Sequence, residues 1–176
     1  MEEGRSLEEQ LDDFKAEKLV WAKTAAVCLD VDYTILLPRT LASQLFQRLE
    51  SELEYYSGDL AKIFVYGKYR DGNDHISEHR DDEKDLDPNM PIASLSLGQT
   101  RDFVFRHRDA RKPAPYKKNI PPVNLVLEHG SLLMMNPPTN KLWFHSLPKR
   151  KRCPGVRLNL TFRSIFPKES KHHVTG

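Results

Sequence analysis

Short β-like runs separated by turn residues fill the chain after residue 62, and they constrain its fold more than any other feature. Within the runs, apolar and polar side chains tend to alternate, and the segments between them are rich in Asp, Asn, Gly and Pro. The predicted strands are residues 62–66, 92–97, 101–106, 123–127, 131–135, 142–145 and 156–165. Many short strands at such intervals favour a sandwich, a jelly roll or a barrel.

One segment before these strands has the pattern of a helix. Its apolar residues recur at the spacing of one helical face and are Leu41, Leu45, Phe46, Leu49 and Leu53. Thr40 is its predicted N-cap and Gly58 its predicted end. We expect this helix to lie against the sheet, after a short strand at residues 27–34.

The chain length suits one compact domain, which we assign to residues 27–167. Residues 1–26 are expected to form an acidic tail or a loosely attached helix, and residues 168–176 a C-terminal tail. The only cysteines, Cys28 and Cys153, are far apart, so neither a disulfide framework nor a cysteine-rich zinc site is indicated. No apolar run is long enough to cross a membrane and the N-terminus lacks a secretory pattern, so we expect no membrane partner and a location inside the cell.

Charge is distributed unevenly along the chain. Residues 101–176 contain 16 Lys and Arg against 4 Asp and Glu, whereas the first hundred residues contain 11 against 21. A basic half of this kind suggests a polyanionic partner, although a solvated surface would explain the charge pattern equally well.

A candidate metal site begins with His79-Arg80-Asp81. In an extended segment, residues two apart lie on the same face, so the imidazole and the carboxylate could reach one ion. An H-x-D motif alone is most often a surface histidine beside a charged turn, and a facial triad needs a second, distant histidine. Among the other histidines, His145 is the best candidate because it ends an aromatic run and precedes an unusual strand by twelve positions.

That strand alternates two kinds of side chain over residues 157–163. One face is apolar, and the other carries Arg157, Asn159, Thr161 and Arg163. Such a face is normally solvated, but two guanidinium groups with an amide and a hydroxyl could also line a pocket for a small dicarboxylate.

At these residues the sequence resembles the AlkB family of Fe(II)/2-oxoglutarate-dependent nucleic-acid demethylases. The resemblance covers about residues 32–166 and is carried by the segments 69–72, 79–83, 91–94, 101–107, 129–136 and 157–163. It implies a mainly β, α+β fold, the double-stranded β-helix or jelly roll, with a helix packed on the sheet. The implied iron ligands are His79, Asp81 and His145.

The resemblance also implies a chemistry. The 2-oxoglutarate contacts would be Tyr69, Arg157, Asn159, Thr161 and Arg163, with Arg163 assigned to the distal carboxylate. With Fe(II), 2-oxoglutarate and O2, such enzymes oxidise the N-methyl group of 1-methyladenine or 3-methylcytosine and release formaldehyde and succinate. The expected partner is double-stranded DNA with a flipped base, the expected oligomeric state is a monomer, and the expected location is the nucleus.

The implied substrate contacts fall into groups with competing explanations. Tyr66 matches an inserted aromatic wedge but could equally pack in the core, and the carboxylates near the base could be a solvated turn. The basic loop at 149–152 could grip DNA, act as a nuclear localisation signal or be solvated. The assigned residues are Tyr66, Gly67, Lys68, Asp82, Glu83, Arg106, Lys149, Arg150 and Lys151, and Arg111, Lys112, Lys117 and Lys118 could add phosphate contacts.

One departure from the family pattern lies between Lys68 and Tyr69. There the family has several tens of residues, including an Asn that holds 2-oxoglutarate, whose place is taken by Gly67. We therefore expect an incomplete jelly roll that is less stable, aggregation-prone or weakly active. This keeps open a catalytically impaired DNA-binding variant, and a zinc hydrolase built on the same triad is a third reading that leaves the 157–163 face unexplained.

Overall fold

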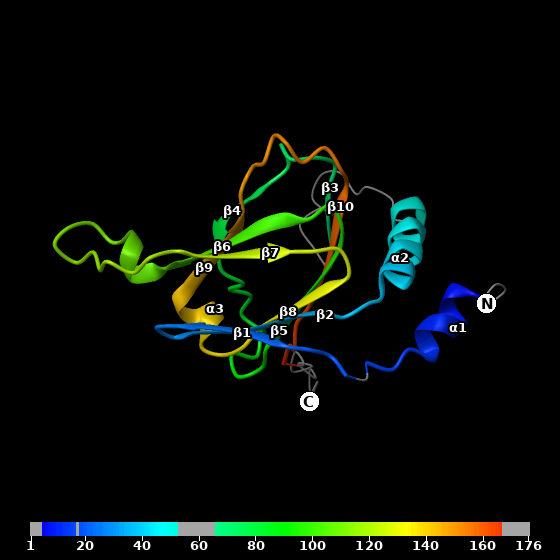
Figure 1. Ribbon diagram of the computed structural model, residues 1–176. Helices are drawn as coiled ribbons and strands as arrows, with labels where there is room; N and C mark the ends of the chain where they lie inside the picture. The colour runs from blue at the N-terminus through cyan, green and yellow to red at the C-terminus, as the bar shows by residue number, and fades with distance from the viewer. Residues whose placement is uncertain (1–4, 17, 53–65, 167–176) are drawn as a thin grey trace, which may run out of the picture.

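The computed structural model describes residues 5–16, 18–52 and 66–166, and it consists of two antiparallel sheets packed face to face (Figure 1). Over the described residues the larger sheet has the strand order β1-β2-β8-β5-β10-β3 and the smaller has β4-β9-β6-β7. This arrangement confirms the mainly β jelly-roll fold. The larger sheet comprises β1 Ala22–Ala26, β2 Leu29–Ile35, β3 Tyr66–Tyr69, β5 Ile92–Gly98, β8 Ser131–Met135 and β10 Arg157–Phe162; the smaller comprises β4 Ile76–His79, β6 Arg101–His107, β7 Val123–Leu127 and β9 Trp143–Leu147.

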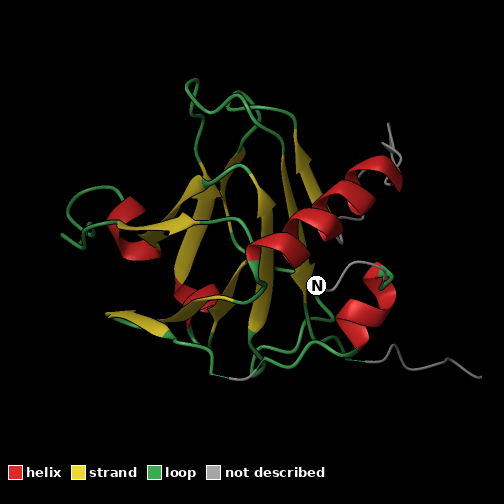
Figure 2. Cartoon of the chain, turned by 45° about the vertical axis from the view of Figure 1, so that its right-hand side comes forward, coloured by secondary structure: helices red, strands yellow, loops and turns green. Residues whose placement is uncertain are grey.

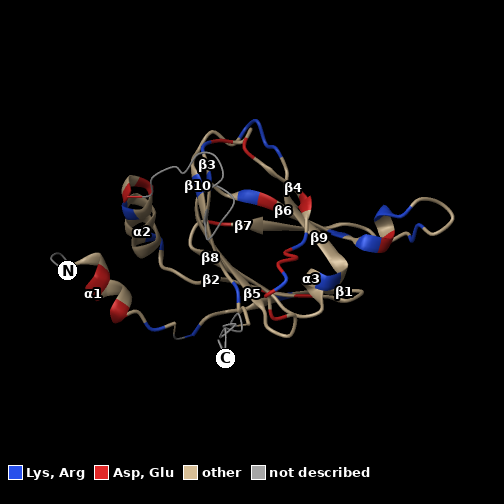
Figure 3. Ribbon diagram, turned by 180° about the vertical axis from the view of Figure 1, so that it is seen from behind, with Lys and Arg blue, Asp and Glu red and all other residues tan. Residues whose placement is uncertain are grey.

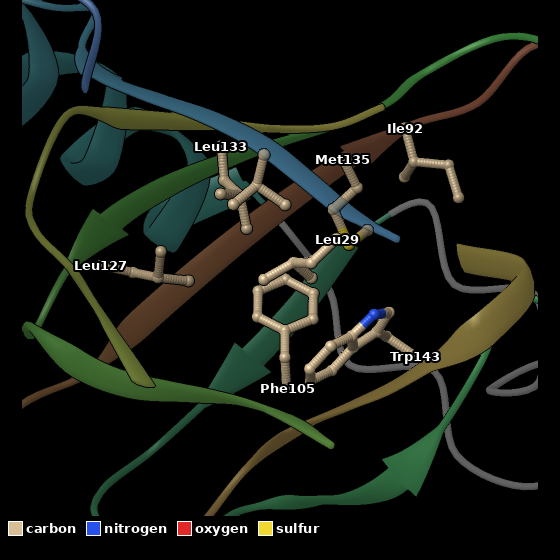
Figure 4. Close-up of a cluster of buried hydrophobic side chains, with 8 residues drawn as sticks. Leu29, Ile92, Phe105, Leu127, Leu133, Met135 and Trp143 are labelled. Carbon is tan, nitrogen blue, oxygen red and sulfur yellow. The ribbon is translucent and has the colours of Figure 1, made fainter. Parts of the chain in front are cut away.

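The main core lies between the two sheets (Figure 4). Trp143 is fully buried there and donates a hydrogen bond through Nε1 to the Val27 carbonyl at 3.0 Å, which joins β9 to the β1–β2 turn. The buried residues of this cluster are Leu29, Val31, Ile92, Phe105, Leu127, Leu133, Met135 and Trp143. Both sheets contribute to it, so the core fixes the sheets relative to each other.

Helix α2, Arg39–Glu52, covers the outer face of the larger sheet, as predicted (Figure 2). Its buried Leu41 and Ala42 pack with Leu95 and Leu97 of β5, and Leu45, Phe46 and Leu49 are packed against the same cluster. The predicted N-cap at Thr40 is wrong, because the helix already includes Arg39. The predicted end at Gly58, like Leu53, lies outside the described residues.

Most strand predictions after residue 90 are confirmed, with shifts of a few residues. Residues 123–127 and 131–135 match β7 and β8, whereas β9 starts at Trp143 because the short helix α3, Thr139–Leu142, precedes it. β4 was not predicted, and of residues 62–66 only Tyr66, the first residue of β3, is described. The predicted strand at 27–34 is wrong at its start, because Val27 and Cys28 form the turn between β1 and β2 and Cys28 has a φ of 57°.

The N-terminal segment contains ordered elements. Helix α1, Leu7–Asp12, has a capping box in which Ser6 and Glu9 exchange hydrogen bonds, and its apolar side packs on the α2 cluster. β1 pairs along its whole length with β2. Among the described residues, the helix expected within residues 1–26 is therefore limited to Leu7–Asp12, while the three-part division of the chain stays a prediction. None of the described helices is long and apolar enough to span a membrane.

We expect Leu127→Ala to lower the free energy of unfolding by about 2–5 kcal/mol, because it empties space in a fully buried core. The matched control is Val126→Ala, one residue earlier on the opposite face of β7 and 53% exposed, which should change stability by no more than about 0.5 kcal/mol. Chemical denaturation measures both. Equal losses for the two variants would show that the core is placed wrongly.

Candidate metal centre

The two histidines of the predicted triad come from neighbouring strands. In the antiparallel pairing of β4 with β9, His79 lies directly opposite His145, and their ring centroids are 4.3 Å apart. Asp81 follows two residues after His79, just beyond the end of β4. Its Oδ1 lies 3.8 Å from Nε2 of His79 and 3.6 Å from Nε2 of His145. The structure therefore brings together the three predicted ligands, whose ligating atoms all lie within 4.8 Å of one another.

The loop that carries Asp81 is held by side-chain contacts rather than by the strand. The Asp81 main-chain N–H donates to Oδ1 of Asn140 at 3.1 Å, and the Asn140 amide donates back to the Asp81 carbonyl at 2.7 Å. Arg163 donates from Nε to Oδ2 of Asp81 at 2.8 Å. Because Arg163 occupies Oδ2, the other carboxylate oxygen, Oδ1, remains turned toward the two histidines.

The hydrogen bond of His79 and the neutral state of His145 suit metal binding. Nδ1 of His79 lies 2.9 Å from the Ser77 carbonyl, which can only accept a hydrogen bond, so Nδ1 carries the proton and the Nε2 lone pair is available. Burial and the neighbouring His79 lower the pKa of His145 to about 4, so this imidazole is neutral near pH 7. Phe103 stacks on the His145 ring at 5.4 Å and fixes its plane.

This donor set fits Fe(II). Two imidazoles and one carboxylate form the facial triad of non-haem Fe(II) oxygenases, which leaves coordination positions open for co-substrate and O2. Nδ1 of His145 is buried and has no hydrogen-bond partner among the described residues. A metal bound to Nε2 would therefore be the main polar interaction of the His145 ring.

The polar face of β10 forms a connected row of hydrogen bonds. Arg157 donates from Nη2 to Ser96 Oγ at 2.9 Å and to Asn159 Oδ1 at 2.8 Å. Asn159 in turn donates to Thr161 Oγ1 at 2.8 Å and accepts from Ser94 Oγ at 2.9 Å. The row is therefore not a solvated strand face, because it lies against the serines of β5 inside the sandwich.

Arg157 is a buried cation that forms no ion pair with a carboxylate among the described residues. It is 2% exposed, and burial lowers its pKa to about 10, so it remains charged near pH 7. The pairing of β10 with β3 sets Tyr69 opposite it, with the guanidinium carbon 5.3 Å from the ring centre. Burial also raises the pKa of Tyr69, which keeps its hydroxyl protonated. A buried cation without a carboxylate partner, beside the ring of a neutral tyrosine, suits an anionic ligand.

Arg157, the first residue of β10, and Arg163, which directly follows the strand, lie at different ends of this row. Arg163 is beside the metal ligand Asp81 and also 3.9 Å from Glu83, whereas Arg157 is six residues away along the strand. Arg163 therefore lies at the metal end of the row, and its assignment to the carboxylate remote from the metal stays a prediction.

One cavity of about 1020 Å³ contains the triad and the polar row. Its lining includes all of the residues assigned to the metal and to 2-oxoglutarate, and also Gly67, Lys68, Asp82 and Glu83. Sequence reasoning missed Phe103, Ser94, Ser96 and Asn140. The two serines could have been found, because they alternate with Leu95 and Leu97 on a predicted strand and so face away from the helix.

Figure 3 shows Lys and Arg in blue on the loop between β9 and β10 and on the loop after β6. Apart from Lys68, the predicted basic contacts are not among the residues that line the cavity, and several of them are paired with acids. Arg106 and Arg111 both reach Glu78, at 2.7 and 3.1 Å, and Arg150 pairs with Asp102. Lys149 and Lys151 are exposed, and Lys112 and Lys118 hold the buried carboxylate of Asp109. The Tyr66 side chain lies outside what the structure describes.

Comparison with known proteins agrees with this geometry. The model of the 2OG-Fe(II) oxygenase superfamily matches residues 33–163, so the chain belongs to that superfamily. It is 40% identical over 203 residues to the DNA oxidative demethylase ALKBH2 of Mus musculus, with 84% of each chain covered, and 39% identical over 202 residues to that of Homo sapiens, covering 83% of this chain and 77% of the relative. It is also 37% identical over 123 residues to the alpha-ketoglutarate-dependent dioxygenase alkB homolog 3 of Rattus norvegicus, covering 68% of this chain and 40% of the relative. Within the superfamily the chain is therefore a member of the AlkB family, which uses Fe(II) and 2-oxoglutarate.

The alignment with the mouse relative also shows a shortened chain. Since 84% of 176 residues is about 148, an alignment over 203 positions leaves about 55 positions of the relative without a counterpart. This agrees with the expected loss of several tens of residues inside the chain. In the structure, Lys68 and Tyr69 are consecutive residues of β3, the last strand in the described order of the larger sheet.

Replacing His145 by Ala should weaken Fe(II) binding more than about 100-fold. Loss of a residue that only hydrogen-bonds to a metal ligand typically weakens metal binding about 10–100-fold, and loss of the ligand itself should weaken it further. Competition with a chromophoric Fe(II) chelator without O2 measures the affinity. The matched control is His75→Ala, an exposed histidine that lines the same cavity but lies outside the triad, and it should leave the affinity unchanged. Equal affinities for His145→Ala and wild type would rule out this metal site.

Proposed function

We propose that this chain is an oxidative demethylase of N-methylated bases in DNA, with 1-methyladenine and 3-methylcytosine as substrates. The observation that carries the proposal is the convergence of His79, Asp81 and His145 beside the unpaired buried cation Arg157, in one cavity of an AlkB-family fold. The relatives named as DNA oxidative demethylases support DNA as the substrate. The zinc hydrolase reading is dropped, because it gives the arginine row no role.

The cavity suggests how the co-substrate is oriented. A dicarboxylate that meets the metal with one end places its other carboxylate away from the triad, and Arg157 with Tyr69 provides a cation and a hydroxyl donor there. We therefore assign the distal carboxylate to Arg157 rather than to Arg163. Arg163 orients the Asp81 carboxylate at the metal end by its hydrogen bond to Oδ2, and Asn159 and Thr161 complete the wall between the two arginines.

Bound Fe(II), with 2-oxoglutarate and O2, would supply the oxidation of the N-methyl carbon, and the hydroxymethyl product would release formaldehyde. The chain's own residues position the methylated base. Asp82 and Glu83 line the cavity with exposed carboxylates, which favour a cationic methylated ring over a neutral one. A base can reach this cavity only after it leaves the helical stack, and a methylated pair costs less to open than an intact pair.

The exposed Lys149 and Lys151 supply phosphate contacts to the nucleic acid in this proposal, and Arg106 and Arg150 add to the basic surface. The substrate form in this proposal is a duplex with one flipped base, because the basic surface can contact the duplex while the cavity holds the flipped base. A monomer acting in the nucleus is part of the same proposal.

The direct test is to incubate the protein with Fe(II), 2-oxoglutarate, ascorbate and a duplex that contains 1-methyladenine. We expect loss of the methyl group with formation of formaldehyde and succinate, and no loss with Asp81→Ala. Demethylation that persists in the Asp81→Ala variant would contradict the proposal, because it would not depend on the triad.

A catalytically impaired DNA-binding variant is the second candidate, and the roughly 55 missing positions favour it. Gly67 lines the cavity beside Tyr69, so this position offers no amide to the co-substrate. Salt-sensitive duplex binding without succinate formation, in protein shown to bind Fe(II), would select this candidate over the active enzyme.

Arg157→Lys should weaken 2-oxoglutarate binding on the order of tenfold or more, because a lysine cannot reproduce the bidentate fork that suits a carboxylate. Anaerobic calorimetry with the Fe(II) protein measures this affinity. Arg152→Lys, on the exposed basic loop, is the matched control and should bind 2-oxoglutarate like wild type. An unchanged affinity in Arg157→Lys would remove this residue from the co-substrate site.

The double variant Lys149→Ala/Lys151→Ala should bind duplex more weakly. The slope of log affinity against log salt concentration should also become shallower by about 2, because each lost phosphate contact reduces the size of this slope by about 0.9. Fluorescence anisotropy at several salt concentrations gives the slope. Lys23→Ala, an exposed lysine that pairs with Asp30, is the control with an unchanged slope. A wild-type slope in the double variant would show that the basic loop does not touch the backbone.

A further inference from the structure

Arg101 is a buried cation to which the proposed chemistry assigns no role. It starts β6, is 2% exposed, and forms no ion pair with a carboxylate among the described residues. Nη1 donates to the Asp71 carbonyl at 3.1 Å, and Nη2 donates to the carbonyls of Asp74 at 3.0 Å and Pro148 at 2.8 Å. Burying a charge without a counter-ion is costly, so these three main-chain contacts are the interactions that compensate for it.

The three carbonyls belong to two different loops. Residues 70–75, here called the cavity turn, follow Tyr69, and Arg70, Asp74 and His75 line the cavity. The second loop is residues 148–156, which include the basic residues 149–152, and from here on the whole loop is called the basic loop. It carries the exposed lysines. The two loops meet at the top of the molecule in the view of Figure 1, and Arg101 hydrogen-bonds to both.

The main chains of the two loops also touch directly. The Arg150 N–H donates to the Gly72 carbonyl at 2.7 Å. A Cβ added at Gly72 would lie 1.7 Å from the Arg150 carbonyl oxygen, a distance that would force the loops apart. Gly72 and Arg101 therefore hold the same junction from two sides, one by leaving space and the other by hydrogen bonds.

We propose that Arg101 is a positioning residue for nucleic-acid binding, which holds the basic loop on the cavity turn so that Lys149 and Lys151 contact the phosphates of the strand whose base enters the cavity. This rests on the proposed function. A guanidinium can reach carbonyls on both loops because its nitrogen atoms diverge, whereas the single nitrogen of a lysine cannot span them. The residue acts through the loop and does not touch the substrate.

The test uses two variants that disturb the junction differently. Arg101→Lys keeps the charge and loses the fork, and Gly72→Ala keeps Arg101 and inserts a methyl group between the loops. The protein is loaded with Fe(II) and 2-oxoglutarate without O2. Its affinity for a duplex that contains 1-methyladenine is then measured over a range of salt concentrations. Arg48→Lys, on the outer surface of α2 and paired there with Glu8 and Glu52, is the matched control.

We expect both junction variants to bind duplex on the order of tenfold more weakly and with a salt slope shallower by about 1–2, while Arg48→Lys matches wild type. The slope separates positioning from destabilisation, because a partly unfolded preparation has fewer active molecules but the same slope. If Arg101→Lys does not fold, Gly72→Ala alone decides the question. Wild-type affinity and slope in a folded junction variant would overturn this inference and leave the proposed function standing, whereas a wild-type protein that does not bind duplex would overturn both.

Discussion

The pairing of β4 with β9 is the constraint on which the site depends, because it sets His79 opposite His145. Asp81 completes the triad only because its loop is tethered to Asn140 and its carboxylate to Arg163. The strand pairing thus supplies two ligands, and the contacts around the loop supply the third. A change in the β4–β9 register would separate His145 from His79 and Asp81, since a shift of one residue turns a side chain to the other face.

The cavity exists because small side chains line it where large ones could have filled the sandwich. Ser94 and Ser96 face inward from β5, while Leu95 and Leu97 of the same strand pack under α2. The hydrogen-bonded row of β10 lies beside these serines and forms one wall of the cavity. The same alternation therefore anchors the helix on one face and opens a polar pocket on the other.

Sequence reasoning succeeded where a motif and a strand pattern coincide. His79 and Asp81 follow from their spacing, and the row from Arg157 to Arg163 follows from alternation along one strand. It failed for β4, because the polar residues before His79 resemble a turn and only the pairing with β9 makes them a strand. The place of Arg163 and the burial of Arg101 were also not predictable, since both depend on which loops the fold brings to them.

The most direct test of the metal centre is to add Fe(II) and then 2-oxoglutarate to the protein without O2 and to record the visible spectrum. A weak charge-transfer band should appear in the wild type when the co-substrate chelates the metal, and it should be absent in His145→Ala. Folded wild-type protein that gives no band at saturating Fe(II) and 2-oxoglutarate would contradict the claim that these three side chains share one iron ion.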